Sequence, residues 1–151
     1  MKQNPHLISR IKGKHSFPTV VAFGGVHGNE PAGVLALEKV VKTIEKDQLH
    51  FHGNFYAIKG NLKALDKKVR FIHKDLNRIW TRRNIKHLFD DQEVFAELEE
   101  QRELFQLIRD IFSESVGPFY FIDLHTTSSY TIPFITISDS LNNRKFSSNF
   151  H

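Results

Sequence analysis

The chain has 151 residues, of which 40% are hydrophobic, with no cysteine and a net charge of +4. This size suits a single domain over residues 1–151, and any metal must be held by His, Asp or Glu because thiolates are excluded. No apolar run reaches the length of a membrane span and no secretory segment opens the chain, so a cytoplasmic location is expected. The scattered Lys and Arg residues favour a solvated surface over a nucleic-acid patch.

In the first half of the chain, strands alternate with a helix. A polar lead-in with a short edge strand over residues 1–17 precedes a β-branched strand at 19–23. Apolar positions at helical spacing predict a helix over 31–46, with Asn29 as its cap. Residues 49–58 predict one or two further strands.

The second half continues the alternation. In chain order it predicts a loop at 70–78, a helix at 92–112, a buried strand at 119–124, another strand at 130–137 and a polar tail at 138–151 without a closing element. This order predicts an α/β fold with a mixed, largely parallel central sheet flanked by helices. Because the tail ends soon after the last strand, we interpret the chain as the amino-terminal part of a longer protein, truncated at the C-terminus.

The turn between the first strand and helix carries an imidazole and a carboxylate three residues apart, His27 and Glu30. Another histidine, His125, follows the strand predicted at 119–124. Since the carboxyl ends of parallel strands meet at one edge of a sheet, we expect these three side chains to converge. Two histidines and one glutamate are typical ligands of a catalytic zinc, which keeps a fourth position for water.

The glycines around His27 allow a rival interpretation as a phosphate-binding loop. This loop, however, has neither the Gly-Lys-Ser/Thr ending of a P-loop nor the Gly-x-Gly-x-x-Gly spacing of a dinucleotide site. The phosphate interpretation is therefore weak.

The loop at 70–78 holds further candidates for binding and catalysis. Arg78 with Asn77 beside it suits a substrate carboxylate. Asp75 suits the free ring N–H of a metal-bound histidine, and Arg70 suits a developing oxyanion. Taken singly, each residue fits a surface ion pair better, or a helix cap in the case of Asp75.

Together these blocks resemble the succinylglutamate desuccinylase/aspartoacylase family, a branch of the zinc carboxypeptidase superfamily. The blocks are Gly-Gly-Val-His-Gly-Asn-Glu at 24–30, Arg-Phe-Ile at 70–72 with Asp-Leu-Asn-Arg at 75–78, and Asp-Leu-His-Thr-Thr at 123–127. They occur in the family's order and at similar spacing, over residues 19–137. The resemblance implies a zinc-carboxypeptidase-like fold, of which this chain is only the front part.

The resemblance also implies a metal and a reaction. His27, Glu30 and His125 match the ligands of one Zn²⁺ per chain. The implied enzyme is a zinc-dependent amidohydrolase that acts on a linear amide bond and removes an acyl group from an N-acyl amino acid, with zinc-bound water as nucleophile.

The loop residues receive their roles from the same resemblance. Asn77 and Arg78 match the pair that holds the substrate's carboxylate, and Arg70 matches the arginine that polarises the scissile carbonyl. Asp75 matches the outer partner of the first zinc histidine. The expected partner is a small N-acyl amino acid, with no nucleic acid and no membrane. The acyl group, the amino acid and the formation of a homo-oligomer stay open.

One part of the family pattern is missing. The general-base glutamate of the family lies well downstream of the third ligand, and Glu114 is no substitute by position. General acid–base help contributes ~10²–10⁴-fold, so the isolated chain is expected to bind zinc and hydrolyse poorly. The alternatives are a zinc carboxypeptidase that acts on peptides and a non-catalytic metal- or ligand-binding module.

Overall fold

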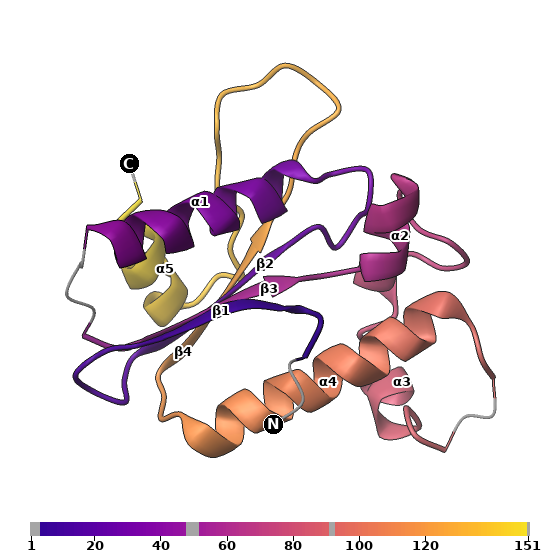
Figure 1. Ribbon diagram of the computed structural model, residues 1–151, viewed down its shortest axis with the longest axis horizontal. Helices are drawn as coiled ribbons and strands as arrows, with labels where there is room; N and C mark the ends of the chain where they lie inside the picture. Colours follow the sequence, from indigo (N-terminus) through magenta and orange to yellow (C-terminus); the bar gives the residue numbers. More distant parts are fainter. Residues whose placement is uncertain (1–3, 48–51, 91–92, 151) are drawn as a thin grey trace.

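A four-stranded sheet with the strand order β1-β3-β2-β4 lies at the centre of the molecule (Figure 1). The computed structural model describes residues 4–47, 52–90 and 93–150. The strands are β1 (Leu7–Lys12), β2 (Thr19–Gly24), β3 (Asn54–Lys59) and β4 (Phe119–Leu124). β3 and β4 run parallel to β2, and β1 pairs antiparallel with β3 at the edge. The mixed, largely parallel sheet predicted from the sequence is confirmed.

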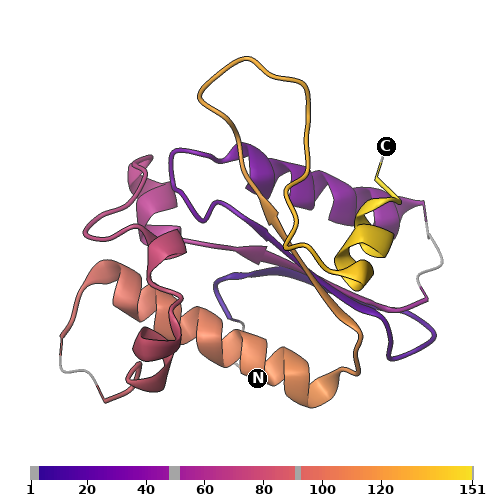
Figure 2. The ribbon, with the colours of Figure 1, turned by 180° about the vertical axis from the view of Figure 1, so that it is seen from behind.

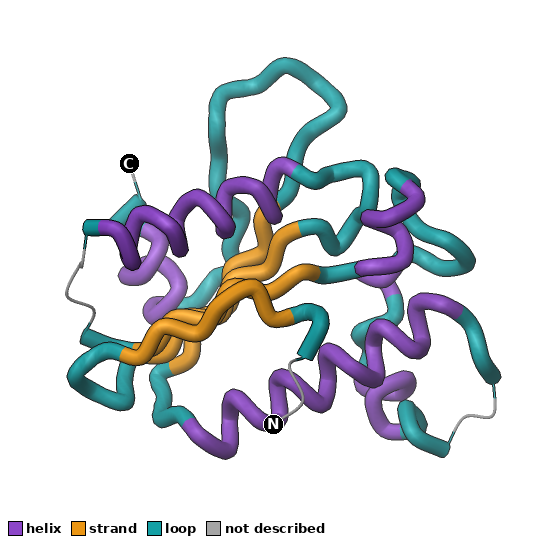
Figure 3. The backbone as a smooth tube through the Cα atoms, viewed as in Figure 1, coloured by secondary structure: helices purple, strands orange, loops and turns teal. Residues whose placement is uncertain are grey.

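Helices cover both faces of this sheet (Figures 1 and 3). They are α1 (Ala32–Lys46), α2 (Leu62–Lys67), α3 (Arg82–Lys86), α4 (Ala96–Glu114) and α5 (Leu141–Ser147), with a 3₁₀ turn η1 (Leu76–Arg78). α1 lies on one face and α4 on the other, while α5 lies on the side of α1 (Figure 2). No helix in the described ranges is long and apolar enough to cross a membrane.

Alternate residues of the strands divide the core into two apolar clusters, one on each face. In β2, Val21 faces α4 and Ala22 faces α1. In β3, Tyr56 faces α4 and Ala57 faces α1. The buried members on the α4 side are Val21, Val26, Tyr56, Ile58, Leu76, Ile79, Leu104, Leu107 and Ile111. Those on the α1 side are Ala22, Leu37, Val41, Phe55 and Ala57. Packing on both faces therefore fixes the sheet, including the edge where the parallel strands β2, β3 and β4 end.

The predicted cap of α1 is wrong. The helix begins at Ala32 with Pro31 in the N-cap position, and no side chain caps it. Asn29 instead lies within a turn that the Glu30 N–H closes on the carbonyl oxygen of His27, at 3.0 Å. The end of the helix at Lys46 agrees with the prediction.

Two predicted strands differ from the structure. β4 is not buried, because it forms an edge of the sheet, and Phe121 is 49% exposed. The strand predicted at 130–137 does not form, and Ile132 there is 83% exposed. β-branched and aromatic residues favour a strand only where a neighbouring strand and a packing surface are present. This segment instead projects from the body of the molecule (Figures 1 and 2).

Three short helices, α2, α3 and α5, were not predicted. α2 begins after Asn61, whose side chain accepts from the Ala64 N–H at 3.0 Å. α5 forms within the polar tail, where Phe146 stacks on Tyr120 of β4 with ring centroids 4.1 Å apart. Residues 49–51 and 92, which the sequence assigned to a strand and a helix, lie outside the described residues.

Candidate metal centre

Three side chains converge where β2 and β4 end. His27 and Glu30 lie on the turn between β2 and α1, and His125 directly follows β4. The parallel register pairs Gly24 with Leu124, so both strands end at the same level of the sheet. Each of the three side chains offers one donor atom, and these donor atoms lie within 4.8 Å of one another. The convergence expected from the sequence is present, and the role of these residues as metal ligands stays a prediction.

Glycines give the turn its shape. Gly25 has a φ of 72°, a left-handed conformation that residues with a Cβ rarely adopt. Gly28 packs so closely on α2 that a Cβ at this position would lie 2.0 Å from the carbonyl carbon of Ala64. Its N–H also donates to the carbonyl oxygen of Arg70 at 3.2 Å. The turn that carries His27 is thereby fixed against the segment that carries Arg70.

Glu30 joins the two histidines. Its Oε1 lies 3.0 Å from Nδ1 of His27 and its Oε2 lies 3.2 Å from Nδ1 of His125. The Thr126 N–H also donates to Oε2 at 2.8 Å. Burial by itself would raise the pKa of Glu30, but the hydrogen bonds from Thr126, His27 and His125 lower it overall. Glu30 is therefore held as a carboxylate between two imidazoles.

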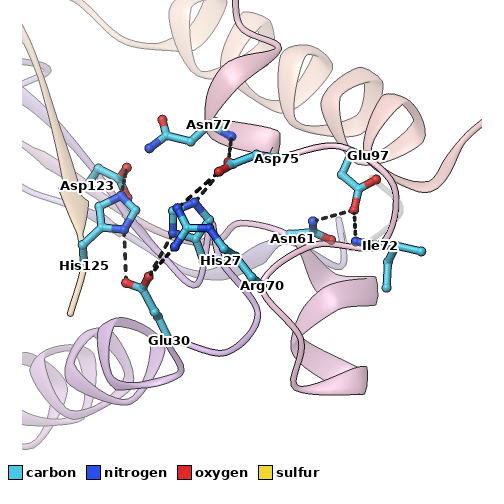
Figure 4. A network of polar contacts seen from close by, with 10 residues as sticks. All are labelled: His27, Glu30, Asn61, Arg70, Ile72, Asp75, Asn77, Glu97, Asp123 and His125. Atoms are coloured by element: carbon cyan, nitrogen blue, oxygen red, sulfur yellow. Dashed lines mark hydrogen bonds and ion pairs between the residues drawn. The ribbon is translucent and has the colours of Figure 1, made fainter. Parts of the chain in front are cut away.

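A second carboxylate lies behind each ring (Figure 4). Nε2 of His27 lies 3.1 Å from Oδ1 of Asp75, and Nε2 of His125 lies 2.6 Å from Oδ2 of Asp123. The role of Asp123 was missed by the sequence analysis. The signal was present in Asp-Leu-His at 123–125, because residues two apart at the end of a strand face the same side.

This arrangement fits a divalent metal ion. A neutral imidazole carries one N–H, yet both rings face a carboxylate at each nitrogen. A cation held by Glu30 and the two Nδ1 atoms would leave each Nε2–H to donate to the outer carboxylate, an arrangement common at metal-bound histidines. Zinc in particular accepts two His and one Glu.

Arg70 lies beside the three converging side chains. Its Nη2 donates to Oδ2 of Asp75 at 3.2 Å, and its Nη1 lies 3.7 Å from Oε1 of Glu30. Burial alone would raise the pKa of Asp75, whereas its contacts with His27, the Asn77 N–H and Arg70 lower it overall. The side chain of Arg70 is 47% exposed, so this cation at the site is open to solvent.

Asn77 and Arg78 belong to η1, which Asp75 caps. The Asn77 N–H donates to Oδ1 of Asp75 at 2.9 Å, and the Arg78 N–H donates to the carbonyl oxygen of Asp75 at 2.9 Å. Both residues are exposed, and Figure 4 shows the amide of Asn77 pointing away from His27. The backbone thus places them at the site, and their role in binding a carboxylate stays a prediction.

A cavity of about 190 Å³ borders the site at Asn77 and Asp123. Its other lining residues are apolar: Phe23, Val26, Leu76, Trp80, Leu104, Ile108 and Phe121. Asn77 and Asp123 thus supply its amide and carboxylate groups.

Comparison with known proteins points to one family. The family model described as the succinylglutamate desuccinylase/aspartoacylase catalytic domain matches residues 16–148. A succinylglutamate desuccinylase of Photorhabdus laumondii is 31% identical over 121 residues, which cover 80% of this chain and 36% of that protein. One of Serratia proteamaculans is 28% identical over 107 residues, covering 71% of this chain and 31% of that protein. The chain thus spans about a third of the length of these curated relatives.

Solved structures agree with this match. The crystal structure of the succinylglutamate desuccinylase from Chromobacterium violaceum has a TM-score of 0.58 and 26% identity, covering 71% of this chain and 32% of that one. The structure of succinylglutamate desuccinylase from Vibrio cholerae has a TM-score of 0.62 over 83% of this chain and 41% of that one. At 18% identity, the second likeness shows the fold alone.

Proposed function

The chain belongs to the succinylglutamate desuccinylase/aspartoacylase family, and we propose that it carries the zinc centre of an enzyme that hydrolyses N-acyl amino acids. The relatives it matches are named as succinylglutamate desuccinylases, which makes removal of an acyl group from an amino acid the best supported reaction class. The matched residues cover only 31% and 36% of these relatives, so this proposal concerns the whole protein in which the residues act.

One observation carries the proposal: His27, Glu30 and His125 converge, and a carboxylate lies behind each histidine ring. A bound zinc ion would supply Lewis acidity and activate water for attack on the amide carbonyl. Glu30 holds the two rings at a common point, and Asp75 and Asp123 fix their orientation.

The neighbouring residues supply substrate binding. Arg70 presents a half-exposed guanidinium beside Glu30, where it stabilises negative charge that develops on the carbonyl oxygen of the amide. Asn77 and Arg78 bind the carboxylate of the amino acid, the guanidinium through a bidentate contact. The apolar walls of the adjoining cavity suit the hydrocarbon part of the substrate rather than a further charged group.

A second candidate function is a metal-binding module without catalysis. Within the described ranges, the carboxylates that meet at this site are Glu30, Asp75 and Asp123, and each of them contacts a histidine. None of the three is free to act as a general base while it holds a ring. This observation favours the candidate for the chain on its own.

The test is a product assay with the zinc-loaded whole protein in which these residues act. N-succinylglutamate, an N-acylaspartate and a blocked dipeptide are supplied in parallel, and His125→Ala is the control variant. Release of a free amino acid together with a small acid, lost in His125→Ala, is the expected result. Cleavage of the peptide alone would indicate a carboxypeptidase, and bound zinc without any turnover would favour the binding module.

A further inference from the structure

The segment from Arg70 to Arg78 contributes several groups to the site but little regular structure to hold them. Apart from the short turn η1, it forms no helix or strand. Arg70 stands at its start, and Asp75 follows near its middle and contacts His27. The position of the outer carboxylate behind His27 therefore depends on whatever fixes residues 72–74.

A buried carboxylate on α4 fixes them. Glu97, in the first turn of α4, has no exposed surface. Its Oε1 accepts from the Ile72 N–H at 2.6 Å, and its Oε2 accepts from the N–H groups of His73 at 3.0 Å and Lys74 at 3.1 Å. Three consecutive backbone donors thus point at one side chain, an arrangement that binds anions well.

Asn61 completes this cluster. Its side-chain amide donates to Oε1 of Glu97 at 3.3 Å while its carbonyl oxygen caps α2 (Figure 4). Burial would raise the pKa of Glu97, but the bonds from Ile72, Lys74, His73 and Asn61 lower it overall, so the group is ionised. A buried charge is costly to desolvate, and these four donors offset that cost.

The chain connects this anchor directly to the metal centre. Lys74, the last residue bound to Glu97, is followed at once by Asp75. Asp75 in turn lies 3.1 Å from His27 and 3.2 Å from Arg70. A shift of the backbone at 72–74 therefore moves the carboxylate that orients His27.

A neighbouring carboxylate on α4 anchors a different segment of the chain. Glu100, three residues after Glu97 on α4, is also buried and accepts from the N–H groups of Leu62 at 2.9 Å and Lys63 at 3.2 Å. Those two residues begin α2, not the segment at 70–78. Glu100 thus resembles Glu97 in burial and chemistry but does not bind residues 72–74; it holds α2, which packs on Gly28, and its Oε2 also lies 3.6 Å from Nε2 of His6.

We propose that Glu97 is a positioning residue of the metal centre, which acts through residues 72–74 on Asp75 and thereby on His27. This inference rests on the proposed function where it concerns zinc. Its core, the coupling of Glu97 to the orientation of His27, concerns the chain itself and is measured without metal.

The experiment compares Glu97→Gln, Glu97→Asp and Glu100→Gln with the wild-type chain by NMR, first without metal. In Glu97→Gln one acceptor oxygen becomes a donor NH₂, so the amide protons of residues 72–74 are expected to exchange about tenfold faster or more, since the lost bonds are charge-assisted. The ring resonances of His27 are expected to shift with them. Glu100→Gln should leave the exchange of the amide protons of residues 72–74 near its wild-type value, because Glu100 binds Leu62 and Lys63 instead.

Zinc affinity, measured by competition with a chelator, is the second readout. We expect about tenfold weaker binding in Glu97→Gln, the lower end of the range for loss of an outer partner, and a smaller loss in Glu100→Gln. If Glu97→Gln does not fold, Glu97→Asp keeps the charge, withdraws it by one methylene, and should shift the same resonances by less. Unchanged His27 resonances in a folded Glu97 variant would overturn the inference. A wild-type chain that binds no zinc would refute only the proposed function, since the metal-free signals still decide this one.

Discussion

The imidazole of His27 and the carboxylate of Asp75 lie on different loops, yet Nε2 of the ring is 3.1 Å from Oδ1 of the carboxylate. His125 and Asp123 repeat this relationship on the other side of Glu30. Because each ring is held from behind, its Nδ1 is directed toward Glu30. The orientation of the donor atoms is thus fixed by side chains of the protein itself.

Replacing Asp75 by Asn tests this orientation. The amide keeps an acceptor oxygen that can cap η1 but loses the negative charge behind His27. We expect zinc affinity, measured by chelator competition on the folded variant, to fall about 10- to 100-fold. Asp139→Asn, which removes an exposed partner of Arg144, is the control and should leave zinc affinity unchanged. Equal affinities for wild type and Asp75→Asn would refute the role of Asp75.

Arg78→Ala tests the carboxylate site. A hydrogen bond to a charged group is worth about 1.5–3 kcal/mol, so we expect the KM or Kd for N-succinylglutamate to rise about 10- to 100-fold. Zinc affinity should stay the same, because the side chain of Arg78 is exposed and only its backbone contacts Asp75. Arg83→Ala, an exposed arginine on α3, is the matched control. Similar effects of the two substitutions would argue against a specific role for Arg78.

Gly28→Ala tests the close packing of the His27 turn on α2. The new Cβ would lie 2.0 Å from the carbonyl carbon of Ala64, so backbone must move. Overpacking of this kind costs about 1–3 kcal/mol in the free energy of unfolding, measured by urea denaturation. Gly117→Ala, whose Cβ would meet the ring of Phe119 at 3.0 Å and the Phe119 backbone N at 3.5 Å, should cost less. A larger loss of unfolding free energy in Gly117→Ala than in Gly28→Ala would contradict the close packing of Gly28 on α2.

The pH dependence of stability tests the buried charge of Glu97. Its pKa in the folded chain lies below the ordinary value of 4.5. A lowered pKa contributes stability that is fully present above the unfolded pKa and is lost as the pH falls through the folded pKa. We therefore expect the difference in unfolding free energy between wild type and Glu97→Gln to be constant from pH 7 to about 5.5 and to shrink below about pH 4.5. A difference that does not change down to pH 3 would contradict the ionised state.

The sequence was most informative where the signal is local. The glycines and the flanking strand and helix predict the turn that carries His27 and Glu30. The position of His125 is predicted because this residue comes directly after a parallel strand. The role of Asp123 could have been found from its spacing to His125, whereas that of Glu97 depends on contacts with residues that only the fold brings near, which periodicity on α4 cannot reveal.

The misassigned segments have a related cause. Residues 130–137 have the composition of a strand, but strand formation needs a partner, and the described part of the chain provides none beside them. α5 was not predicted because most of its residues are polar. Its contact with the sheet is the stacked pair of Phe146 and Tyr120. In both places tertiary contacts decided the outcome.

The most direct test of the metal centre is the zinc content of the purified chain, measured by elemental mass spectrometry beside His27→Ala and His125→Ala. Circular dichroism of all three samples shows whether each is folded. The account predicts one zinc per wild-type chain and loss of that zinc in both variants. A folded wild-type chain without zinc, or stoichiometric zinc retained by either variant, would contradict it.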